Sequence, residues 1–238
     1  MQVPCTGCKK ECFSELIGTY ALVFLGPGSV IVASIIPNFQ GFLRTAFIGS
    51  MFGGTVGIVI LLLGNFGAVI NPAITFGASF AKVLSSKFLV PFLFFQILGG
   101  LLAGFTLKIV FGSVGEGTEL GSTFLSPGIS PVFGLTLETI GTFILTSSAL
   151  VASTQLTRNW QKGLLVGLTL FCLILLIGPL TGAGFNPARS LGPALAAGFF
   201  QNLSIYIVGP VLGASVAGLV FRVLRGNGRK ASGLVCLC

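Results

Sequence analysis

The chain has 238 residues, of which 53% are hydrophobic and only 8% are charged. A soluble domain normally carries about 25% charged residues, so this composition excludes an ordinary soluble protein and indicates one that lies within a bilayer. Glycine is abundant, at 35 residues, and small residues let transmembrane helices approach one another closely. The formal net charge of +8 does not indicate nucleic-acid binding, because the basic residues are scattered and form no single patch.

Long neutral stretches of the length that crosses a bilayer recur along the chain. A span needs roughly 20 mostly apolar residues. The expected spans, in chain order, are Phe13–Ile35, Thr45–Leu63, Phe88–Phe111, Val132–Thr154, Leu164–Leu180 and Leu203–Phe221. The first is too long for a signal-peptide core and is therefore kept as a span. Two further apolar stretches, Asn71–Val83 and Asn186–Gly198, are too short to cross and predict re-entrant helices.

The basic residues predict the orientation of these spans. With six crossings, both termini share one side, which collects Lys9, Lys10, Lys82, Lys87, Arg158, Lys162, Arg222, Arg225, Arg229 and Lys230. The other side has Arg44 and Lys108. The positive-inside rule therefore predicts a multi-pass protein of the cell membrane with both termini in the cytoplasm. The basic excess also predicts contacts with anionic membrane lipids.

Most of the cysteines lie on the expected tails, residues 1–12 and 222–238. These are Cys5, Cys8, Cys12, Cys236 and Cys238, whereas Cys172 lies in a span and is expected to face lipid or a neighbouring helix. Cytoplasmic tails disfavour disulfides. The spacing of Cys5, Cys8 and Cys12 leaves metal binding or lipid attachment open, but without histidine or a second tight pair we expect reduced thiols, no metal and no cofactor.

The two halves of the chain repeat each other in order. Glu15-Leu-Ile-Gly-Thr returns as Glu138-Thr-Ile-Gly-Thr, and Gly67-Ala-Val-Ile-Asn-Pro-Ala returns as Gly182-Ala-Gly-Phe-Asn-Pro-Ala. We expect one transmembrane domain with repeats over residues 13–111 and 132–221, joined by a linker over residues 112–131. Each repeat holds three spans, so the second copy is inverted, and inverted repeats place their shared site near the bilayer midplane.

Both short stretches begin with Asn-Pro-Ala: Asn71, Pro72 and Ala73, then Asn186, Pro187 and Ala188. Proline suits the first helical turn, and asparagine is a good N-cap that also carries amide donors. Two half-helices that dip in from opposite faces would bring their electropositive N-termini together. That point would repel cations and favour solutes with lone pairs. An enzyme is not expected, since the sequence offers no nucleophile–base pair, metal cluster or nucleotide loop.

These motifs resemble the aquaporin, or major intrinsic protein, family over nearly the whole chain, roughly Phe13 to Phe221. The resemblance implies an all-α membrane fold of six transmembrane helices plus two re-entrant half-helices, one pore per subunit and a homotetramer. It implies passage of water and small uncharged solutes with exclusion of ions and protons. Arg189 follows the second Asn-Pro-Ala, and a charged residue at this depth marks a functional site.

The resemblance also implies a selectivity filter of Phe52, Ile174, Ala183 and Arg189. Counting back from Gly67 gives Met51 in place of Phe52, but the Phe52-Gly53 pair matches the family's aromatic-glycine pair. Strict water channels usually carry histidine where Ile174 stands, and this chain has none. We therefore expect a wider, more apolar filter, similar to that of archaeal methanogen-type aquaporins and some broad-range plant channels.

Glu15 and Glu138 are the acidic residues of the expected spans. A carboxylate at such a position is either a proton relay or, as the resemblance implies, a brace that accepts hydrogen bonds from the loop before each half-helix. Gln96 is expected to bridge helices by hydrogen bonds. The sequence leaves both interpretations of the glutamates open, and the resemblance favours bracing.

Two other functions fit parts of the pattern. A secondary transporter also uses inverted repeats and broken helices, but it generally needs groups that bind a coupling ion. A junctional membrane protein with a vestigial pore is disfavoured by the intact Asn71, Asn186 and Arg189. Water, glycerol, ammonia, hydrogen sulfide and carbon dioxide all remain candidate solutes.

Overall fold

The structure is a computed structural model that describes residues 9–226, and these residues form helices and loops without a strand. Six long helices have the length and hydropathy needed to cross a membrane. They are α1 (Lys9–Ile35), α2 (Gly41–Leu63), α4 (Leu89–Phe111), α6 (Pro131–Gln155), α7 (Asn159–Thr181) and α9 (Ile205–Arg225). Two short helices, α3 (Pro72–Phe80) and α8 (Pro187–Ala197), complete the bundle. The predicted fold class is confirmed, and the expected spans differ from the helices by a few residues at their ends.

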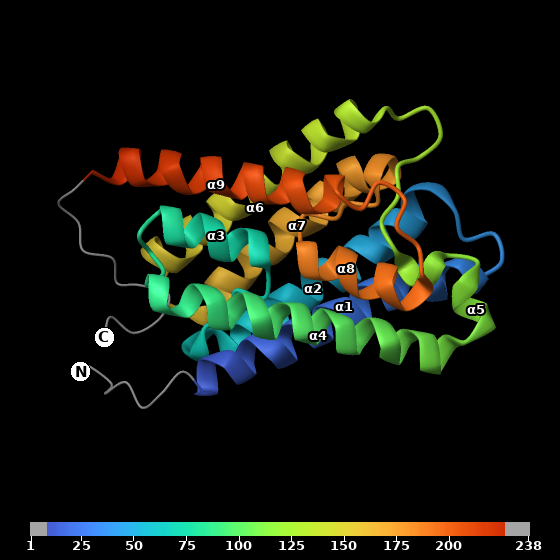
Figure 1. Ribbon diagram of the computed structural model, residues 1–238, viewed down its shortest axis with the longest axis horizontal. Coiled ribbons are helices and arrows are strands. Elements are labelled where there is room, and N and C mark those ends of the chain that lie inside the picture. The colour runs from blue at the N-terminus through green and yellow to red at the C-terminus, as the bar shows by residue number, and fades with distance from the viewer. Residues whose placement is uncertain (1–8, 227–238) are drawn as a thin grey trace.

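The helices pack with the symmetry of the repeat. Helix α1 packs along α4, and its counterpart α6 packs along α9. Each half-helix leaves its own repeat and packs on the last helix of the other one, α3 on α9 and α8 on α4 (Figure 1). The first turn of α1 and the last turn of α9 lie at one end of the bundle, with α5 (Ser113–Glu116) at the opposite end (Figure 1).

The linker between the repeats is more structured than a Gly- and Ser-rich sequence predicts. It contains α5 and a 3-10 turn, η3 (Glu119–Gly121), which contacts both α1 and α8. Leu120 is buried in a cluster with Ile31 of α1 and Leu107 of α4. This hydrophobic contact fixes the linker over one end of the bundle.

One cysteine lies elsewhere than expected. Cys12 lies within α1 and is buried, whereas the sequence predicts it on an N-terminal tail. Cys172 on α7 is exposed. Cys5, Cys8, Cys236 and Cys238 lie outside the described residues, as do Arg229 and Lys230.

Helices α2 and α7 cross at a pair of glycines whose backbones nearly touch. A Cβ atom added to Gly167 would lie 2.5 Å from the carbonyl oxygen of Gly53, and one added to Gly53 would overlap the carbonyl oxygen of Gly167. Real Cβ atoms essentially never approach backbone atoms so closely. The crossing therefore depends on the absence of side chains, as is common where transmembrane helices pack.

Substituting alanine at neighbouring positions of α2 tests this crossing. Gly53→Ala is expected to destabilise the folded protein by about 1–3 kcal/mol, because the overpacked helices must move apart. Gly54→Ala is the matched control, since a Cβ there meets no atom within 4 Å. Thermal unfolding in detergent should separate the two variants, and equal melting temperatures would contradict the packing described for α2 and α7.

Candidate functional site: the paired half-helix tips and the filter

The two half-helices begin in the same way. Asn71 caps α3 by accepting a hydrogen bond at Oδ1 from the N–H of Ala73, at 2.9 Å. Asn186 caps α8 by accepting from the N–H of Ala188 at 3.0 Å. A proline occupies the first turn in both, where its missing N–H leaves no hydrogen bond unmade. Each Asn-Pro-Ala sequence therefore starts a helix with its amide at the tip.

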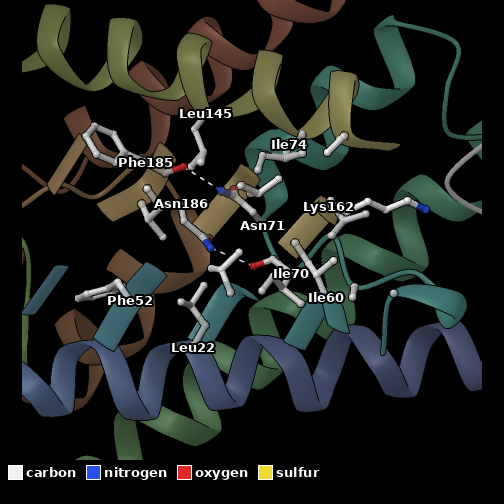
Figure 2. A pocket seen from close by; sticks show the side chains of 18 of the residues that line it. Leu22, Phe52, Ile60, Ile70, Asn71, Ile74, Leu145, Lys162, Phe185 and Asn186 are labelled. Carbon is white, nitrogen blue, oxygen red and sulfur yellow. Dashed lines mark hydrogen bonds between the residues drawn. The ribbon is translucent and has the colours of Figure 1, made fainter. Parts of the chain in front are cut away.

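The two tips bond directly to each other across the repeats. Nδ2 of Asn71 donates to the carbonyl oxygen of Phe185 at 2.9 Å, and Nδ2 of Asn186 donates to the carbonyl oxygen of Ile70 at 2.9 Å (Figure 2). A side-chain amide has two N–H donors, so each asparagine keeps one beyond this bond. Both asparagines line the same cavity. The electropositive ends of α3 and α8 thus meet at one point, with amide donors available there.

The loops leading to the tips hold an unusual backbone conformation. Ala68 and Ile70 have φ of 59° and 49°, and Ala183 and Phe185 have φ of 48° and 49°. Positive φ is costly for residues other than glycine, most of all for a β-branched one such as Ile70. The same loops contain the carbonyl groups of Ile70 and Phe185, which accept hydrogen bonds from the asparagine amides.

Two fully buried glutamates hold these loops. Glu15 of α1 accepts hydrogen bonds from the N–H groups of Val69 at 2.8 Å and Ile70 at 2.6 Å. Glu138 of α6 accepts from Gly184 at 2.9 Å and from Phe185 at 2.7 Å. Hydrogen bonds to a charged acceptor are stronger than neutral ones. The carboxylates therefore face the strained segments that precede both tips.

Other polar groups extend each of these contacts. Nε2 of Gln96 on α4 donates to Glu15 at 2.7 Å and to Thr75 of α3 at 2.9 Å. In the second repeat the hydroxyl of Thr181 donates to Glu138 at 2.7 Å, and the hydroxyl of Tyr206 donates to the carbonyl of Thr181 at 2.8 Å. Each long helix except α2 thus contributes a side chain to the hydrogen bonds around Glu15 or around Glu138. The loops before the two tips are therefore held from several sides.

A cavity of about 280 Å³, here called the pore cavity, passes both tips. Phe52 lies at one end of it, and Lys162 of α7 lies toward the other (Figure 2). Arg189 also lines the cavity and lies against the Phe52 ring. Its walls between these ends are mostly apolar and include Leu22, Val56, Ile74, Leu145 and Leu170. Among the described residues that line it, none is a carboxylate. Its polar groups are the asparagine amides, the Ser153 hydroxyl, loop backbone and the Arg189 and Lys162 side chains.

A second cavity, here called the linker-side vestibule, adjoins the pore cavity at its Arg189 end. Phe52 and Arg189 line both cavities, so the boundary between the two falls at this pair. Ile174 lines the vestibule and Ala183 lines the pore cavity. The structure thus brings together the four residues assigned to a filter from sequence. Met51, the alternative from plain counting, lines neither cavity.

Arg189 is held in place at this boundary. Its side chain is 2% exposed, its guanidinium carbon lies 5.1 Å from the centre of the Phe52 ring, and Nη1 donates to the carbonyl of Gly121 at 2.9 Å. A guanidinium is a permanent charge with fixed donors. Its position places a cation at the junction of the two cavities.

The sequence did not reveal every group at this site. The carbonyl of Gly121 comes from the linker, and nothing in a Gly- and Ser-rich segment indicates that it accepts from Arg189. Lys162 was assigned only to the basic side of the membrane, although it also lines the pore cavity. Its position near the start of α7, close to a predicted loop, is the one sequence feature that places Lys162 near an end of the passage.

The arrangement defines a class of protein: a helical membrane channel with a passage through the subunit. A model of the major intrinsic protein family matches residues 4–221. The aquaporin AqpM of Methanothermobacter thermautotrophicus is 33% identical, with the match covering 92% of this chain and 98% of that protein. A putative aquaporin of Arabidopsis thaliana, NIP4-1, is 34% identical, covering 91% of this chain and 75% of that protein.

The fold also matches a solved structure, the X-ray structure of the aquaglyceroporin from Plasmodium falciparum. The TM-score is 0.79 at 22% identity, and the match covers 92% of this chain and 95% of that one, which supports the shared fold. The chain belongs to the major intrinsic protein family, the aquaporins. It is a multi-pass membrane protein and a passive channel for water and small solutes.

Proposed function

We propose that solutes pass from the linker-side vestibule between Phe52 and Arg189, then along the half-helix tips, and leave beside Lys162. The observation that carries this proposal is that Asn71, Asn186 and Arg189 line one continuous cavity. A cation on this path would meet the arginine charge and then two helix N-termini, with no lining carboxylate to offset them. Neutral molecules with lone pairs would instead receive hydrogen bonds. The channel therefore excludes ions and protons.

The filter composition favours solutes somewhat larger and less polar than water. Phe52, Ile174 and Ala183 present apolar surface, so Arg189 supplies most of the hydrogen bonding at the junction. An apolar wall replaces less of water's hydration than a polar one. We infer passage of water together with small neutral solutes, among which glycerol, ammonia, hydrogen sulfide and carbon dioxide remain candidates.

The setting of the channel follows from family and charge. From the family we infer a homotetramer in the cell membrane. We also infer that both termini lie in the cytoplasm, because basic residues cluster at the end of the bundle that holds the first turn of α1 and the last turn of α9. Arg222 and Arg225 at the end of α9 are suited to contacts with anionic membrane lipids. We infer that the channel lets solutes pass down their concentration gradients and catalyses no reaction.

Substituting Ile174 tests the filter assignment. Ile174→His adds a polar ring to the wall, so water permeability relative to glycerol permeability is expected to rise, roughly tenfold if the added ring both narrows the junction and replaces a solute hydrogen bond. Stopped-flow light scattering of proteoliposomes measures both permeabilities. Leu176→His is the matched control on α7, since Leu176 is 72% exposed and lines neither cavity. An unchanged ratio in Ile174→His would remove Ile174 from the filter.

A further inference from the structure

The linker-side vestibule gathers positive charge that none of its described lining residues offsets. Arg44 of α2 lines it together with Arg189, and none of the described residues that line it is a carboxylate. The described part of the chain also gives Arg44 no ion pair. Two arginine side chains therefore line the same space.

Several buried donors in this vestibule lack a hydrogen-bond partner. Nε of Arg44 and Nε of Arg189 are buried without one, and so is the hydroxyl of Ser122, whose side chain is 5% exposed. All three residues line the vestibule. Buried polar groups are normally satisfied, and an unsatisfied one calls for a specific explanation such as an absent ligand. The unused groups here are donors in a cationic setting, which suits an acceptor with negative charge.

The beginning of α2 adds to the same potential. Gly41 and Phe42, in its first turn, line the vestibule, and the N-cap Gln40 makes no side-chain capping bond. The first N–H groups of a helix have no intrahelical partner and carry the positive end of the helix dipole. Helix N-termini of this kind accept anions readily. This contribution is independent of the two arginines.

Apart from the Thr45 hydroxyl, the other side chains of the vestibule are apolar. Phe42, Ile48, Phe124, Ile174 and Leu175 form much of its wall, and its volume is about 540 Å³. A small inorganic ion would leave these surfaces wet. A molecule with an oxyanion group and a compact apolar body would satisfy both the donors and the wall.

We propose that the linker-side vestibule is a binding site for a small organic oxyanion, a carboxylate or sulfonate with an apolar body. The oxyanion lies between Arg44 and Arg189, with Ser122 and the first turn of α2 as further donors. Because Arg189 and Phe52 also form the boundary of the pore cavity, a ligand seated there closes the passage. The site makes permeation sensitive to the anions present on that side of the membrane.

Benzenesulfonate is a suitable probe, because it stays ionised and has a small apolar ring. Purified protein is reconstituted in purely zwitterionic lipid, so that no lipid anion competes, with the probe on both sides of the vesicle membrane. We expect concentration-dependent inhibition of water permeability and a rise in melting temperature in detergent. Benzenesulfonamide, which has nearly the same shape without the charge, is expected to do neither.

Arg44→Gln removes one of the two guanidinium groups, and its inhibition is expressed relative to its own uninhibited permeability. The half-inhibitory concentration is expected to rise about tenfold or more, as loss of a charge-assisted bond predicts. Arg158→Gln is the charge-matched control, because Arg158 is exposed on the α6–α7 loop and lines neither cavity. It should keep the wild-type response.

Three results would overturn the proposal. In the first, benzenesulfonate neither inhibits nor stabilises the wild-type protein. In the second, the neutral benzenesulfonamide inhibits as strongly as benzenesulfonate. In the third, Arg44→Gln keeps the wild-type half-inhibitory concentration. A repeat with anionic lipid in the vesicles distinguishes a soluble ligand from a headgroup. If lipid anions alone inhibit, and benzenesulfonate does not, the site is a lipid contact and the proposal fails. The thermal measurement needs no permeation, so its outcome is independent of the filter assignment.

Discussion

Replacing Arg189 with valine is expected to let protons and small cations leak through the channel while the helical bundle stays assembled. Arg189 is 2% exposed and lies at the boundary between the vestibule and the pore cavity. A unit charge roughly 4 Å from a passing cation opposes it by about 4 kcal/mol at an effective dielectric of about 20, or roughly a thousandfold in occupancy. Valine removes that charge and widens the junction.

The leak can be measured with a pH-sensitive dye inside proteoliposomes, after a potassium gradient and valinomycin impose a membrane potential. We expect proton flux per channel to rise roughly tenfold or more, less than the full electrostatic barrier, because the helix N-termini still repel cations. Arg158→Val serves as the control, because it removes an exposed charge outside both cavities. A variant at Arg189 as tight as the wild type would show that this arginine is not a barrier.

The second large effect is expected at Glu15, where glutamine should lower the yield of folded protein severely. Both carboxylate oxygens accept hydrogen bonds, from Val69, Ile70 and Gln96. Glutamine offers one acceptor oxygen, so its NH2 group must face a backbone N–H or the amide of Gln96. Losing charge-assisted bonds of about 1.5–3 kcal/mol each would release the strained loop before the first tip.

Size-exclusion chromatography of detergent extracts and thermal unfolding would measure this effect. Glu116→Gln on α5 is the matched control, because Glu116 is exposed. If Glu15→Gln assembles normally and instead changes the pH dependence of permeation, Glu15 is a proton relay. The two readings of this carboxylate therefore give opposite results on yield and on pH dependence.

Much of the fold could be predicted from the sequence because each signal was local. Apolar length set the spans, and Asn-Pro-Ala set the start of α3 and α8, since proline and asparagine act through their own backbone and cap geometry. The short length of the two stretches excluded a full crossing. The duplication of Glu15 as Glu138, and of Asn71 as Asn186, then fixed the pairing of the halves.

What could not be predicted depended on contacts between distant backbone groups. The positive φ of Ile70 and Phe185 has no sequence signature, because neither residue favours that conformation. Their carbonyls nevertheless accept hydrogen bonds from the two asparagine amides, a contact that the Asn-Pro-Ala motif does not indicate. The carbonyl of Gly121 likewise reaches Arg189 only because buried Leu120 fixes the linker. Such positions follow from packing, which a single sequence does not encode locally.

Stopped-flow permeability of proteoliposomes to a series of neutral solutes, with proton flux recorded in the same vesicles, tests whether the half-helix tips form a passive pore. For a passive pore we expect fluxes of water and small neutral solutes that rise linearly with the gradient, do not depend on sodium or pH, and carry no protons. Saturating uptake that requires a sodium or proton gradient would contradict it and would identify an alternating-access transporter instead.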